Sequence, residues 1–133
     1  MDKYFRKGDS AKQSKVISER DITLFAEVTG DLNPLHLDQE FASKTRFKER
    51  IAHGLLGAGL ISAVLGNQLP GPGSIYLNQS LRFTHPIKIG DLLTAEVRVK
   101  NWNEAKKIID LDTYCINQNN IKVITGEASL LVD

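Results

Sequence analysis

The sequence IAHGLLGAGLISAVLGNQL, residues 51–69, decides the predicted fold. Its large aliphatic side chains recur on every side of a helical wheel, with alanines between them, so no polar face is left. A helix that is apolar all round is a buried helix. Gly54, Gly57 and Gly59 indicate that another backbone or a ligand approaches this helix closely. The following PGPG, residues 70–73, ends the helix.

The sequence after this helix predicts a β-sheet. It is rich in β-branched and aromatic residues and predicts four long strands, at residues 75–84, 92–102, 107–118 and 121–132. Short turns between them predict that consecutive strands pair antiparallel. The polar segment before Ile17 adds one short edge strand. A sheet with one apolar face must be covered, and the helix over 51–69 is the available cover, so we predict an α+β fold with about five antiparallel strands.

Residues 18–47 carry the signals of shorter helices. Ser18, with Asp21 three positions later, predicts a capping box, and Gly30 predicts a left-handed cap at the end of the same helix. Asn33 before Pro34 predicts that a helical turn begins there, since proline is tolerated at the first helical position. A further short helix is predicted after Asp38.

Length and composition limit the class of protein. The chain has 133 residues and a net charge of +1, so we expect one domain over residues 1–133 and no nucleic-acid partner. The single cysteine, Cys115, excludes an internal disulfide and a four-cysteine zinc site, and its strand pattern predicts a core position. No segment predicts a membrane span and the N-terminal segment has no apolar run, so a cytoplasmic location is expected.

The sequence GDLNPLH, residues 30–36, is the densest group of chemically useful side chains. Asp31 and His36 can hold one water between them; the carboxylate can take a proton, and the imidazole can hold or return one. We also expect the start of a helical turn at Pro34 to favour a neutral His36. The alternative interpretation is structural: Asp31 and Asn33 form a turn, and His36 is a packed histidine.

A second group is His53-Gly54, at the start of the apolar helix. The unpaired N–H groups of a helix N-terminus, unshielded at a glycine, can polarise a carbonyl oxygen as an oxyanion hole does. Ser62, two turns along the helix, is expected on the same face, where its hydroxyl bonds either to the site or to the backbone at position 58. An ordinary buried helix start is the alternative.

Other patterns are less specific. Lys44, Arg46, Lys48 and Arg50 form either a solvated charged face or a contact for phosphates. The three histidines show no metal-ligand spacing, and the sequence has no phosphate-binding loop or nucleophile elbow.

Taken together, these segments resemble a known family. FAEVTGDLNPLH at residues 25–36, IAHG at 51–54, and the spacing of Phe83, Pro86, Gly90 and Asp91 are similar to the MaoC-like (R)-specific enoyl-CoA hydratases. The resemblance extends from about residue 7 to residue 132. It implies a hot-dog fold, in which a curved antiparallel sheet wraps a long central helix. Because the chain holds one copy of that fold, it also implies a homodimer.

The same resemblance implies the roles of individual residues. Asp31 and His36 hold the water that adds to a trans-2-enoyl thioester, and the Gly54 N–H, with His53 beside it, polarises the thioester carbonyl. Asn33 supports the turn, and Ser62 matches a polar position on the central helix. No metal or redox cofactor is expected, since CoA or the phosphopantetheine of a carrier protein enters as part of the substrate.

Three other functions remain open at this point. A 3-hydroxyacyl-[acyl-carrier-protein] dehydratase would use the same chemistry, with the basic side chains of residues 44–50 contacting an acidic carrier protein. A hot-dog thioesterase would release a free thiol. A non-catalytic acyl-CoA binding module is the third, although intact Asp31 and His36 argue against it.

Overall fold

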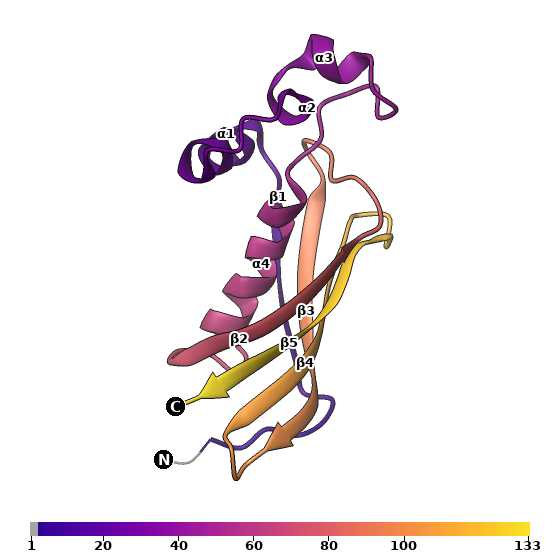
Figure 1. Cartoon of the computed structure of the whole chain (residues 1–133). Coiled ribbons are helices and arrows are strands. Elements are labelled where there is room, and N and C mark those ends of the chain that lie inside the picture. The colour runs from indigo at the N-terminus through magenta and orange to yellow at the C-terminus, as the bar shows by residue number, and fades with distance from the viewer. Residues whose placement is uncertain (1–2) are drawn as a thin grey trace.

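The computed structural model describes residues 3–133 and contains a β-sheet, one long helix and three shorter helices (Figure 1). The strands are β1 (Ser10–Val16), β2 (Ser74–Phe83), β3 (Leu92–Asn103), β4 (Ile108–Ile116) and β5 (Lys122–Val132). The helices are α1 (Glu19–Thr29), α2 (Pro34–Leu37), α3 (Gln39–Ser43) and α4 (Gly54–Asn67). The predicted α+β class, with five strands and one long helix, is confirmed.

The five strands form one antiparallel sheet in the order β1-β3-β4-β5-β2. Pairing of consecutive strands is confirmed for β3 with β4 and for β4 with β5, but it is wrong for β2 with β3. Residues 84–91 do not form a hairpin turn. They carry the buried Ile87, whose carbonyl accepts a hydrogen bond from Ala52 N at 2.7 Å, so this connection crosses near the start of α4 while β2 pairs with β5.

The core lies between α4 and one face of the sheet. Alternate side chains of the central strands point inward, as expected for a sheet with one buried face; they include Leu93, Ala95, Val97 and Val99 of β3 and Ile109, Leu111 and Cys115 of β4. A Cβ on Gly57 would lie 2.7 Å from Ile124 Cδ1 and 2.8 Å from Ile87 Cδ1, so a larger residue at this position would force these packed side chains to move. The predicted core position of Cys115 is confirmed, and burial raises the pKa of its thiol to about 12.

The short helices begin and end where the sequence predicts. Ser18 Oγ accepts a hydrogen bond from Asp21 N at 3.1 Å, and the Asp21 carboxylate accepts one from Ser18 N at 2.9 Å, which completes the capping box. Gly30 ends α1 with φ 77°. Asn33 and Asp38 each cap the helix that follows, as predicted. These caps place the turn at residues 30–36 beside the N-terminal end of α4 (Figure 1).

One face of α4 is less buried than the sequence predicts. Leu60, Ile61, Val64 and Leu65 are buried against the sheet, but Leu55 is 58% exposed, and small or polar residues occupy the rest of the outer face. A single sheet covers only one side of a helix, so within one chain the expectation of burial all round is wrong. No helix in residues 3–133 combines the length and the apolar character that crossing a bilayer demands.

Candidate active site

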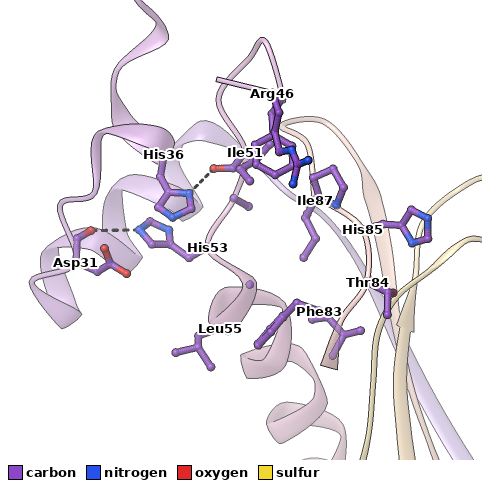
Figure 2. A pocket seen from close by; sticks show the side chains of 15 residues that line it. Asp31, His36, Arg46, Ile51, His53, Leu55, Phe83, Thr84, His85 and Ile87 are labelled. Atoms are coloured by element: carbon purple, nitrogen blue, oxygen red, sulfur yellow. Dashed lines mark hydrogen bonds between the residues drawn. The ribbon is translucent and has the colours of Figure 1, made fainter. Parts of the chain in front are cut away.

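A cavity of about 490 Å³ opens beside the N-terminal end of α4 (Figure 2). It contains four of the predicted site residues, which are Asp31, His36, His53 and Gly54. Its remaining lining comes from the segment before α4, from α4 and β5, and from the end of β2 with the connection that follows it: Arg46, Phe47, Ile51, Ala52, Leu55, Phe83, Thr84, His85, Pro86, Ile87 and Ile124.

The carboxylate of Asp31 is held by a turn that the local sequence forms by itself. Its Oδ1 accepts a hydrogen bond from Asn33 N at 3.2 Å, and Asp31 N donates to Thr29 Oγ1 at 3.1 Å. Asn33 Oδ1 in turn accepts from Leu35 N at 3.0 Å. Such side chain to backbone bonds are why aspartate and asparagine favour turns. The carboxylate stays exposed, so it keeps lone pairs free for a water molecule.

His36 faces the same cavity, and its hydrogen bonds fix its tautomer. Nδ1 lies 2.7 Å from the carbonyl oxygen of Ile51, and a carbonyl only accepts, so Nδ1 carries the hydrogen. In neutral His36, Nε2 is then a hydrogen-bond acceptor. α2 has only four residues, so His36 lies within one turn of both of its ends, and the predicted helix-dipole effect on His36 stays a prediction.

Gly54 is the first residue of α4, and no side chain caps this helix. The N–H groups of a first helical turn have no partner inside the helix, so those at the start of α4 can donate to a ligand in the cavity. A Cβ on Gly54 would lie 2.6 Å from Phe83 Cδ1 and Cε1. Glycine is therefore required for the backbone and the Phe83 ring to line the cavity together.

His53 lies between these groups and is only 2% exposed. Its Nε2 lies 3.2 Å from the main-chain oxygen of Asp31, and its ring packs against that of His36 with centroids 4.0 Å apart. Burial is the largest effect on its pKa and lowers it below 6.5; the nearby His36 lowers it further, whereas the hydrogen bond to Asp31 opposes the shift. His53 is thus neutral in the folded protein near pH 7.

This lowered pKa predicts a loss of stability in acid. Between the depressed pKa of folded His53 and its ordinary value of 6.5, the unfolded chain binds more protons than the folded chain. The free energy of unfolding therefore falls as the pH drops below about 6.5. Urea unfolding at pH 7 and pH 5 measures this loss. His53→Gln should show a smaller loss, and equal losses in both proteins would contradict the assignment.

Two predicted site residues lie outside the cavity. Asn33 acts through the turn, by the two hydrogen bonds given above. Ser62 lies eight residues beyond Gly54, about 12 Å along the helix axis, on the exposed face of α4 beside Tyr76 and Leu77 of β2. Within one chain, Ser62 does not share a cavity with Asp31 and His36.

The basic residues predicted as one face have different environments. Lys44 pairs with Glu40 at 3.9 Å, and the side chain of Arg50, only 14% exposed, donates to His36 O at 2.8 Å and to Glu19 at 2.6 Å. Arg50 is thus part of the scaffold that holds His36. Arg46 is the member of this group that lines the cavity (Figure 2).

The apolar wall of the cavity was not predicted as part of the site. Leu55, Phe83 and Ile87 lie on three different segments, and only the fold brings them together. The polar groups also cluster more tightly than the sequence indicates. A carboxylate oxygen of Asp31 and one ring nitrogen each of His36 and His53 all lie within 4.8 Å of one another. Sequence spacing did not reveal this group, because His36 and His53 belong to separate segments.

Comparison with known proteins identifies the family of the chain. The model of the MaoC-like domain family matches residues 6–120. An (R)-specific enoyl-CoA hydratase of Rhodospirillum rubrum is 50% identical over 127 residues, which is 96% of this chain and 88% of that protein. A solved (R)-hydratase of Aeromonas caviae, described as involved in PHA biosynthesis, superposes with a TM-score of 0.93 at 44% identity, over 97% of this chain and 98% of that one. The chain belongs to the MaoC-like domain family.

Proposed function

We propose that this protein is an (R)-specific enoyl-CoA hydratase, a hydro-lyase that adds water to a trans-2-enoyl-CoA to give the (R)-3-hydroxyacyl-CoA and that catalyses the reverse dehydration. The observation that carries the proposal is the placement of Asp31, His36 and Gly54 around one cavity. The similarity to the hydratase of R. rubrum supports it. Fatty-acid metabolism or the supply of polyhydroxyalkanoate precursors is the metabolic setting that we propose.

The hydrogen-bonding groups suit the activation of one water molecule. The carboxylate of Asp31 and the Nε2 of neutral His36 are both acceptors, so together they hold both hydrogens of a water and direct its oxygen lone pair at the substrate. As the water oxygen bonds to the β carbon, its proton passes to Asp31. The electron pair of the double bond moves toward the thioester oxygen.

The start of α4 receives the charge that develops on that oxygen. The Gly54 N–H donates to the thioester oxygen, and the positive end of a 14-residue helix adds a favourable potential. The α carbon then takes a proton from the Asp31–His36 pair, which completes the addition of water. No metal or redox cofactor has a role in the proposed mechanism, and CoA is part of the substrate.

The experiment that tests the proposal is turnover of crotonyl-CoA, followed as the loss of absorbance of the conjugated enoyl thioester. Loss of that band without release of a free thiol supports a hydratase, whereas thiol release identifies a thioesterase. Binding without turnover identifies a non-catalytic acyl-CoA module. Parallel kinetics with crotonyl-CoA and crotonyl-acyl carrier protein decide between the two carriers, and we expect the higher kcat/KM with CoA.

The geometry also predicts the stereochemical outcome. Asp31 and His36 are close in sequence and line one side of the cavity, so water and proton reach the same face of the enoyl group, which is syn addition. The Gly54 N–H fixes the carbonyl and prevents the substrate from turning its other face. Chiral chromatography should show the (R) product. A predominance of the (S) product would mean that water reaches the opposite face.

We further propose that the protein is a homodimer and that it is located in the cytoplasm. The outer face of α4 and the neighbouring β2 expose apolar side chains, with Ile75, Tyr76 and Leu77 between 42% and 51% exposed. β2 is also an edge strand, and pairing with a second copy would satisfy its free backbone groups. Cell fractionation tests the proposed location, and the protein should be found in the cytoplasmic fraction.

Leu77→Lys tests the proposed dimer. Sedimentation should give a dimer of about 30 kDa for the unmodified chain, twice the 14.8 kDa of one copy. A lysine at Leu77 should shift the equilibrium toward monomer, because a charge would be buried at the contact. Val28→Lys, on an 85% exposed position of α1, is the matched control and should remain dimeric. A stable, fully active monomer of the unmodified chain would contradict the proposal.

A further inference from the structure

His53 stands out among the polar residues of the cavity because it is almost completely buried. At 2% exposure it offers nearly no surface to a substrate, whereas the Asp31 carboxylate is exposed. The sequence predicts His53 as part of the group that contacts the thioester. Its burial points to a different role for this side chain.

The contacts of His53 join the three parts of the site. Nε2 donates to the main-chain oxygen of Asp31 at 3.2 Å. The ring packs against that of His36, with centroids 4.0 Å apart (Figure 2). It also packs against the ring of Phe25, at a centroid distance of 4.6 Å. Along the chain, His53 is the N-cap residue of α4, so its backbone leads directly into the Gly54 N–H.

Its hydrogen bonding also excludes an acid–base role. The Asp31 carbonyl only accepts, so Nε2 carries the hydrogen, and Nδ1 is buried with no partner among the described residues. An acceptor left unpaired in a buried site is unfavourable. The buried Nδ1 therefore takes no part in proton transfer. The function left to the ring is to present the Nε2–H to the main-chain oxygen of Asp31.

We infer that His53 is a positioning residue, which sets the distance between the Asp31–His36 pair and the Gly54 N–H. This inference rests on the proposed hydratase function. The water must lie near the β carbon while the carbonyl is bound at Gly54, and small errors in such a distance lower the rate strongly. His53 acts on this distance because it contacts the turn, the imidazole and the helix start at once.

Two amide substitutions test the hydrogen bond of His53 separately from its ring. Both remove the imidazole, but only one of them keeps the donor. The amide nitrogen of glutamine reaches the position of histidine Nε2, whereas that of asparagine reaches the position of Nδ1. His53→Gln keeps the donor to the Asp31 carbonyl, and His53→Asn loses it. We expect His53→Asn to lower kcat by about tenfold to a hundredfold, with KM changed by less than about threefold. His53→Gln should recover most of kcat.

A third variant controls for stability. Ile61→Val removes a methylene from the core of α4, away from the cavity, and should lower the melting temperature without changing kcat. If His53→Gln and His53→Asn lose kcat equally, the Nε2 bond is not what positions the site, and the inference is wrong. It is also wrong if KM rises in proportion to the loss of kcat/KM, since His53 would then contact the substrate.

A spectroscopic readout keeps this test independent of turnover. In ¹⁵N-labelled protein, the amide resonance of Asn33, which is far from residue 53 in the sequence, should move further in His53→Asn than in His53→Gln. Failure of the unmodified protein to hydrate crotonyl-CoA would contradict the proposed function alone. An Asn33 amide resonance that moves equally in the two variants would contradict the positioning role, whatever the reaction is.

Discussion

Asp31→Asn is expected to lower kcat for crotonyl-CoA hydration by about a hundredfold or more. The asparagine amide has nearly the volume of the carboxylate and keeps an oxygen that can accept from Asn33 N, so the turn should survive. It cannot take the proton from water, which is the step assigned to Asp31. Since Asp31 is exposed, the melting temperature should remain close to that of the unmodified protein.

Asp38→Asn is the matched control for this experiment. Asp38 is also an exposed carboxylate in a turn, where it caps α3, but it does not line the cavity. Its substitution should leave kcat unchanged. His36→Ala should show a loss as large as that of Asp31→Asn and a small loss of stability, because the bond to Ile51 O disappears. Near-normal turnover by either Asp31→Asn or His36→Ala, in folded protein, would refute the assigned roles.

Gly54→Ala is expected to have the next largest effect on turnover. The added Cβ would lie 2.6 Å from two atoms of the Phe83 ring, so either the ring or the start of α4 must move. Loss of one oxyanion-hole donor typically costs about a hundredfold in kcat, and we expect a decrease of about tenfold to a hundredfold here. Steady-state kinetics and circular dichroism of the purified variant measure both the activity and the helix content.

Gly66→Ala provides the comparison on the same helix. A Cβ at Gly66 has nothing within 4 Å, and alanine favours a helix over glycine, so this variant should be at least as stable as the unmodified chain. It should also keep full activity. If Gly54→Ala were as active as Gly66→Ala, the thioester oxygen would not lie against the start of α4.

Local features of the sequence were sufficient to predict the short helices and the turn at residues 30–36. The capping box at Ser18, the left-handed Gly30 and the caps at Asn33 and Asp38 all act over a few residues, and all are confirmed. The position of β2 was not predictable in the same way. Its partner β5 lies at the other end of the strand series, and pairing at that separation depends on the closed core rather than on turn residues.

In the site, too, contacts between residues close in sequence were predictable, and contacts between distant segments were not. Asp31 and His36 are close in sequence, so their proximity was predictable, whereas the stacking of His53 on His36 depends on how two segments pack. Ser62 illustrates the limit of helical periodicity. A period of 3.6 residues shows which residues share a face, but the rise along the axis separates Gly54 and Ser62 by about 12 Å.

The groups assigned to the reaction are encoded separately from one part of the apolar wall of the cavity. Asp31, His36, His53 and Gly54 all come from residues 31–54, while Phe83 and Ile87 come from β2 and the connection after it. A chimaera that exchanges residues 74–91 with those of a relative would therefore alter the acyl group that is accepted and retain the hydration step. Laboratory evolution of new substrate ranges can thus begin in that interval and leave Asp31, His36 and Gly54 unchanged.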